Sequence, residues 1–118
     1  MRTIFVAGSR KYYEDIEAFV RVCKKHNLNA QTPQKEKGRD DFETEKTALL
    51  RAFKIIDGSD AVYIFARKGY VGKTVSIEMG YAYARGKAIY ASEQIDEPSA
   101  QALVTEIVTP AEFVESLA

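Results

Sequence analysis

The 118-residue sequence predicts an α/β protein: a three-layer α/β/α, Rossmann- or flavodoxin-like fold around a five-stranded, mostly parallel sheet. Two observations lead to this prediction. Short and nearly continuous apolar runs, TIFVA at 3–7 and AVYIFA at 61–66, are typical of strands buried on both faces of a parallel sheet. These runs alternate with amphipathic segments of helical period, which is the pattern of strand–helix–strand units. We expect the flavodoxin-like strand order 2-1-3-4-5 with right-handed crossovers.

The first half of the chain predicts two strands and two helices. The strand at 3–7 ends at Gly8, and the helix after it opens with acidic residues, which suit the positive end of a helix dipole. The apolar face of this helix follows the spacing i, i+3, i+4, i+7: Ile16, Phe19, Val20 and Cys23. A short strand at 29–32 comes next. The polar segment 34–41 is expected to be a mobile loop, and a second helix is expected over 42–56.

The second half predicts three strands and two longer helices. The strand at 61–66 is expected in the centre of the sheet, followed by a helix at 74–85 and a strand at 87–92. An edge strand at 105–108 leads to a last helix. That helix opens with the capping box TPAE at 109–112, which carries proline at the first helical position.

Length, charge and cysteine content narrow the class of protein. A chain of this size is expected to form a single domain over 1–118. Its 17 basic and 17 acidic residues give zero net charge, without the basic excess that nucleic-acid binding favours. No apolar run approaches the roughly 18 residues of a membrane span, and the N-terminal segment is expected to be a strand instead of a signal peptide. The only cysteine, Cys23, cannot form an internal disulfide, so we expect a cytoplasmic protein without nucleic-acid or membrane partners.

Three loops carry the residues that could bind a ligand. Carboxyl ends of parallel strands meet at one edge of a sheet, so we expect the loops at 8–13, at 67–73 and after Ser92 to gather there. They offer glycines, cations, hydroxyls and tyrosines, and the helix starting at Thr74 adds a positive N-terminus. This composition predicts a pocket for a small anionic or sugar-like ligand, although tight turns and solvated cations would have the same composition without one. The candidate binding residues are Gly8, Ser9, Arg10, Tyr12, Tyr13, Gly69, Tyr70, Gly72, Lys73 and Thr74.

Two carboxylates are candidate catalytic groups. Glu78 lies four residues after Thr74, on the same side of the predicted helix. It is either a residue favoured by the helix dipole, or a nucleophile that attacks an anomeric carbon and holds a glycosyl intermediate. Asp60, before the central strand, is either a cap of the preceding turn or a supporting acid.

Other chemistries find less support. The run GKT at 72–74 resembles the end of a P-loop, but that motif needs a glycine where this chain has Arg67. The sequence therefore does not favour nucleoside triphosphate hydrolysis. No spacing of His, Cys, Asp and Glu indicates a metal site, and no cofactor is expected.

Residues 57–92 resemble the nucleoside 2-deoxyribosyltransferase-like family, which includes deoxynucleoside 5′-monophosphate N-glycosidases. The resemblance rests on four runs: SDAV at 59–62, GYVGKT at 69–74, EMGYA at 78–82 and GK at 86–87. It implies that Glu78 attacks C1′ of a deoxyribosyl group and expels the base, and that the sugar passes to water or to another base. The aspartate of the pattern corresponds to Asp60. Phosphate contacts would come from Ser9, Arg10 and Thr74.

The resemblance also implies a homo-oligomer, with Tyr81 and Tyr83 either at a dimer interface or packed on the sheet. The chain departs from the transferases in having no acidic residue at 70–74 and no tyrosine in the first strand, where Tyr12 or Tyr13 could substitute. Base exchange is therefore less favoured than hydrolysis. We expect cleavage or transfer at the N-glycosidic bond of a (deoxy)nucleoside or its 5′-monophosphate. The alternative is a nucleotide-binding or sensing Rossmann-like domain without catalysis, to which the run GSR at 8–10 is similar.

Overall fold

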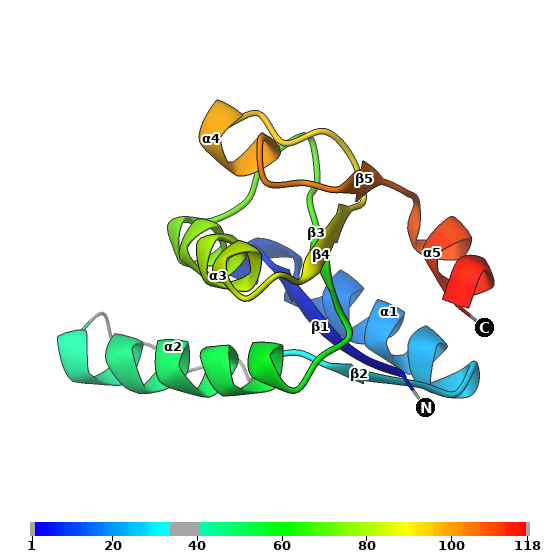
Figure 1. The fold of residues 1–118 in the computed structure, drawn as a ribbon, viewed down its shortest axis with the longest axis horizontal. Coiled ribbons are helices and arrows are strands. Elements are labelled where there is room, and N and C mark those ends of the chain that lie inside the picture. Colours follow the sequence, from blue (N-terminus) through cyan, green and yellow to red (C-terminus); the bar gives the residue numbers. More distant parts are fainter. Residues whose placement is uncertain (1, 34–40, 118) are drawn as a thin grey trace.

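Five parallel strands form one sheet in the order β2-β1-β3-β4-β5 (Figure 1). The strands are β1 (Arg2–Gly8), β2 (Leu28–Gln31), β3 (Ala61–Phe65), β4 (Ala88–Ala91) and β5 (Glu106–Ile107). The predicted fold class and strand order are therefore confirmed. The computed structural model describes residues 2–33 and 41–117. The loop predicted to be mobile at 34–41 lies outside the described residues, apart from Asp41.

Helices cover both faces of the sheet (Figure 1). One face packs against α1 (Tyr13–Lys25) and α5 (Pro110–Leu117). The other face packs against α2 (Phe42–Asp57), α3 (Lys73–Ala84) and the short α4 (Pro98–Gln101). A single 3₁₀ turn, η1 (Arg10–Tyr12), precedes α1. In the described part of the chain, no helix has the length and apolar character to cross a membrane.

The apolar run of β1 is explained by this three-layer arrangement. Ile4 and Val6 pack toward α1, whereas Phe5 and Ala7 pack toward α2 and α3. Because successive side chains of a strand point to opposite faces, a strand covered on both sides needs apolar residues at every position. All four residues are almost completely buried.

Helix α2 packs on the sheet mainly through its C-terminal half. Its fully buried residues are Ala52 and Ile56, while Phe42 in its first turn is 91% exposed. The N-terminal half of the helix extends beyond the sheet in Figure 1. This half therefore leaves apolar side chains on the surface.

Gly8 ends β1 at a point where no larger residue fits. A Cβ atom at Gly8 would lie 2.6 Å from the backbone oxygen of Phe65 and 2.9 Å from Cδ1 of Ile16. The carboxyl ends of β1 and β3 are in register here, with Gly8 opposite Phe65. The glycine therefore lets the two strands end side by side.

Gly8→Ala is expected to lower the free energy of unfolding by about 2 kcal/mol, because overpacking at a backbone oxygen forces the strands apart. Urea denaturation followed by circular dichroism measures this change. Gly80→Ala is the matched control, because nothing lies within 4 Å of a Cβ atom there. In the interior of α3 this control should gain up to about 1 kcal/mol. Equal stability of Gly8→Ala and the unaltered protein would contradict the argument.

Candidate active site

A cavity of about 320 Å³ opens at the carboxyl edge of the sheet. Its walls come from the end of β1 and the turn η1, from the residues that follow β2, and from the N-terminal half of α3. This is the edge at which open α/β sheets bind ligands. The volume falls at the lower end of the range for small-molecule sites, which runs from roughly 300 to 1,000 Å³.

Most of the predicted site residues meet in this cavity. Those that line it are Gly8, Ser9, Arg10, Tyr13, Tyr70, Gly72, Lys73, Thr74 and Glu78. The loops after β1 and β3 therefore come together as expected from the strand order. The expected contribution of the loop after β4 is not observed, and three predicted residues lie elsewhere.

Asp60 is far from the cavity. Its carboxylate oxygen Oδ2 accepts a hydrogen bond from the backbone N–H of Thr3 at 2.8 Å, and its own N–H donates to the Thr3 carbonyl at 2.8 Å. It therefore links the starting ends of β1 and β3. The five residues of β3 separate it from the carboxyl edge by about 16 Å at the usual rise per residue. The structure does not bring Asp60 to Glu78, so its expected role as a supporting acid has no geometric basis.

Gly69 and Ser92 support the β3–α3 loop from behind the cavity. Gly69 has a positive φ of 79°, donates its N–H to Glu93 at 3.0 Å and accepts from the N–H of Asp96 at 2.9 Å. The Ser92 hydroxyl accepts from the Ala66 N–H at 2.8 Å and donates to the Ala66 carbonyl at 2.7 Å. The loop after β4 thus fixes the neighbouring loop and does not line the cavity.

Tyr12 does not line the cavity either. The guanidinium carbon of Arg67 lies 5.5 Å from the centre of its ring, and Arg67 forms an ion pair with Asp15 at 3.0 Å. Tyr13, the next residue, lines the cavity. Of the two tyrosines that could substitute for a first-strand tyrosine, the fold thus brings Tyr13 to the site.

Several residues that line the cavity were not among the candidates named from the sequence, including Lys11, Thr32, Pro33 and Ala48. Thr32 and Pro33 directly follow β2, and β2 is the neighbour of β1. The expected strand order therefore contained the signal for these two. Ala48 comes from α2, and no local pattern in the sequence indicates that it reaches the cavity.

Glu78 is the only acidic residue in the described lining, and it is 5% exposed. Its carboxylate makes no hydrogen bond within the described part of the chain. Burial raises the pKa of the Glu78 carboxyl from an ordinary 4.5 to about 7, and the positive charge of Arg10 acts in the opposite direction. Both protonation states are therefore accessible near neutral pH, which suits a nucleophile or a general base.

The first turn of α3 provides an anion-binding end. Gly72 precedes the helix, and no side chain caps its free N–H groups. Ser9, Arg10 and Lys73 line the same cavity. Arg10 also pairs with Glu45 of α2 at 3.2 Å, with half of its own side chain exposed. A phosphate or similar anion would find donors and positive charge here.

A cation–π contact joins two walls of the cavity. The Lys11 ammonium lies 5.1 Å from the centre of the Tyr70 ring, and both residues line the cavity. Lys11 belongs to η1 and Tyr70 to the β3–α3 loop, so the contact holds these segments together. Across the described ranges, no cluster of three or more His, Cys, Asp or Glu side chains could hold a metal ion.

No family model matches the sequence, and no curated protein matches it either. Solved structures are similar to the whole chain. A conserved protein from Enterococcus faecalis V583 has a TM-score of 0.70 and 15% identity, over 98% of this chain and 96% of its own. A 2-deoxyribosyltransferase from Bacillus psychrosaccharolyticus has a TM-score of 0.68 and 14% identity, over 89% of this chain and 84% of its own. A CMP N-glycosidase from Clostridium botulinum has a TM-score of 0.61 and 14% identity, over 98% of both chains.

The chain has the fold of nucleoside 2-deoxyribosyltransferase-like proteins. The resemblance found in residues 57–92 is therefore confirmed for the fold, over nearly the full length of the chain.

Glu78→Gln is expected to stabilise the protein at alkaline pH. The raised pKa means that the unfolded chain ionises near pH 4.5 and the folded protein only near pH 7, so the unaltered protein loses stability between these values. Glutamine cannot ionise. At pH 8 the variant should gain roughly 2–3 kcal/mol over the unaltered protein, and at pH 4 the two should be similar.

Urea denaturation between pH 4 and pH 8 measures this difference. Glu115→Gln is the control, because Glu115 is exposed on α5, and its effect should stay within about 0.5 kcal/mol at every pH. If Glu78→Gln raises the free energy of unfolding equally at every pH, then ionisation of Glu78 does not destabilise the folded protein.

Proposed function

We propose that the protein cleaves the N-glycosidic bond of a deoxynucleoside 5′-monophosphate, with Glu78 as the nucleophile. The observation that carries this proposal is a buried carboxylate that has no hydrogen-bonding partner among the described residues and lines a cavity that also contains groups suited to an anion. An ionised side chain in such a place is unfavourable for folding, and such residues concentrate at functional sites.

In the proposed reaction, a carboxylate oxygen of Glu78 attacks C1′ of the sugar. The C1′–N bond breaks, the bonding electron pair leaves with the base, and the base takes a proton from solvent. Water then attacks the glycosyl ester, which releases the sugar phosphate and a proton and restores the carboxylate. Another base in place of water would give transfer, for which the cavity offers no acidic side chain besides Glu78 within the described residues.

We assign the phosphate group to the cationic and hydroxyl side chains of the lining. Arg10 and Lys73 supply charge, Ser9 and Thr74 supply hydroxyls, and the uncapped start of α3 supplies N–H groups. The similarity in fold to a 2-deoxyribosyltransferase and to a CMP N-glycosidase supports the same class of reaction.

A nucleotide-binding domain without turnover is the second candidate. It is favoured by the absence of a second carboxyl group in the described lining, because most enzymes that hydrolyse glycosidic bonds use a pair of them. Under this alternative a nucleotide would raise the melting temperature while no base is released.

Glu78→Ala is expected to lower base release by at least about a thousandfold, because the nucleophile is lost. The measurement is chromatography of free base from a panel of deoxynucleosides and their 5′-monophosphates. Arg10→Ala should raise KM for the monophosphates about ten- to hundredfold, because a charged hydrogen bond is lost, and should leave the nucleosides unaffected.

Lys54→Ala is the control, because Lys54 is exposed on α2 and does not line the cavity. Equal base release by Glu78→Ala and the unaltered protein would overturn the proposal. So would binding of nucleotides by the unaltered protein with no base released from any of them.

We also propose a homo-oligomer that uses the outer surfaces of α2 and α3. These helices lie side by side and expose Phe42, Leu50 and Ile77, each at more than half of its full accessible area. Tyr81 packs within the chain, because its ring stacks on Phe53 at 4.1 Å and its hydroxyl donates to Asp57 at 2.8 Å, whereas Tyr83 on the same helix is exposed. Exposed apolar side chains on neighbouring helices are a common feature of subunit interfaces.

Ile77→Asp is expected to shift the protein toward the monomer in sedimentation velocity at tens of micromolar, because the interface would then bury a charge. Val22→Asp on α1, on the other side of the sheet, is the control and should not change the distribution. A monomeric unaltered protein, or an oligomer insensitive to Ile77→Asp, would refute this interface.

A further inference from the structure

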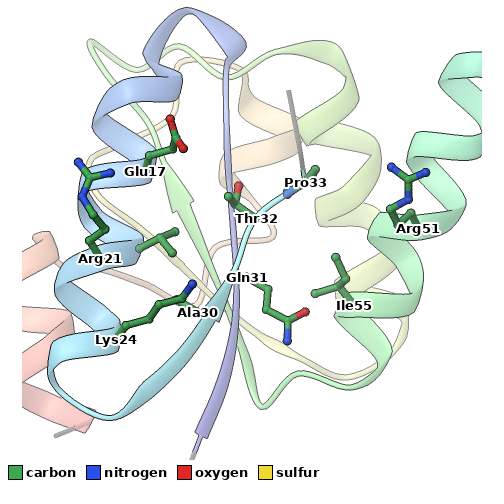
Figure 2. Close-up of a pocket in the computed structure, with 10 residues that line it drawn as sticks. Glu17, Arg21, Lys24, Ala30, Gln31, Thr32, Pro33, Arg51 and Ile55 are labelled. Atoms are coloured by element: carbon green, nitrogen blue, oxygen red, sulfur yellow. The ribbon is translucent and has the colours of Figure 1, made fainter. Parts of the chain in front are cut away.

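A second and larger cavity, of about 590 Å³, is a groove along the outer edge of β2 (Figure 2). Figure 2 shows α1 on one side with Glu17, Arg21 and Lys24, and α2 on the other side with Arg51 and Ile55. The strand runs between them. None of these residues belongs to the site described above.

The floor of the groove is an edge strand. β2 pairs with β1 on one side, and no strand in the described part of the chain pairs with its other side. Such a strand presents backbone N–H and C=O groups that can pair with an added strand. The two walls are helices on opposite faces of the sheet, so they flank the place where that strand would lie.

The walls are positively charged. Among the described lining residues, Arg21 and Lys24 on α1 carry two positive charges beside one acid, Glu17, and α2 contributes Arg51. Arg21 and Lys24 are exposed and form no ion pair with any described residue. The chain as a whole has zero net charge, so this excess is local.

Apolar side chains complete the lining and narrow the class of ligand. Val20 of α1 and Ile55 of α2 offer contacts for apolar side chains on the two faces. The described lining contains no aromatic residue, so a nucleobase would find no ring to stack on. A small inorganic anion would use the cations alone and leave the strand edge and the apolar contacts unused.

We propose that this groove binds an acidic segment of a partner protein in an extended conformation, which adds to β2 as a further strand. Alternate side chains of an added strand point to opposite faces of the sheet. Acidic side chains on one face would reach Arg21 and Lys24, while side chains on the other face would reach Arg51 and Ile55. One class of ligand thus uses the backbone edge, the charges and the apolar contacts together.

The test uses the full chain and a fluorescein-labelled hexapeptide of alternating glutamate and valine, and it involves no nucleotide. Fluorescence anisotropy should show saturable binding that weakens at least tenfold in the double variant Arg21→Glu/Lys24→Glu. The double variant Lys25→Glu/Lys46→Glu has the same net charge and changes residues outside the groove, so it should bind within about twofold of the unaltered protein. Amide hydrogen exchange in β2 should slow when the peptide binds.

Four outcomes would overturn the proposal. The first is no binding up to millimolar peptide, and the second is equal binding of a lysine–valine peptide. The third is an equal loss of affinity in both double variants, which would indicate a general charge effect. The fourth is displacement by tripolyphosphate with no change in β2 amide exchange, which would identify a site for small anions. Circular dichroism of each variant confirms that these surface changes leave the fold intact.

Discussion

The burial of the Glu78 side chain is the constraint around which the site is built. Glu78 lies on the sheet-facing stripe of α3 together with Val75, Met79 and Ala82, so the helical period that forms the core also carries the carboxylate inward. An apolar residue would serve packing better at this position. The protein instead keeps an ionisable group, and the positive charge of Arg10 only partly offsets the effect of its burial on the pKa. Such a local conflict between folding and side-chain chemistry is expected at functional sites.

The loops at the carboxyl edge of the sheet form a cavity around Glu78. Gly8 lets β1 end close to β3, so that the turn after β1 and the loop before α3 face each other across the cavity. The contact between Lys11 and Tyr70 then links the two walls. The β3–α3 loop is held from the other side by Gly69, whose backbone is bonded to the loop after β4. The cavity walls are therefore fixed by the fold before any ligand binds, which lowers the entropic cost of binding.

The sequence predicted the sheet almost completely, because apolar runs such as 3–7 and 61–66 admit few interpretations when helices separate them. It predicted most of the cavity for the same reason, since strand order decides which loops meet. The prediction from the sequence failed where the direction of one side chain, or an element distant in the chain, determines which residues line the cavity. Tyr12 and Tyr13 are neighbours, and the 3₁₀ turn rotates one toward Arg67 and the other toward the cavity. Asp60 matched a motif, but its place directly before β3 puts it at the starting edge of the sheet, away from the carboxyl edge where the cavity opens.

The end of β2 joins the two cavities of the molecule. Thr32 and Pro33 line both the cavity at Glu78 and the groove along β2, and α2 contributes Ala48 to the first and Arg51 to the second. A strand added to β2 would therefore contact the outer side of a wall whose inner side lines the cavity at Glu78. The proline restricts the backbone at this wall, because its ring fixes φ and it donates no hydrogen bond. Within the described residues β2 pairs with no strand except β1, and Thr32 and Pro33 directly follow it, so a shift of this short segment would move a wall of both cavities. The end of β2 is thus a wall that the cavity at Glu78 shares with the groove along β2.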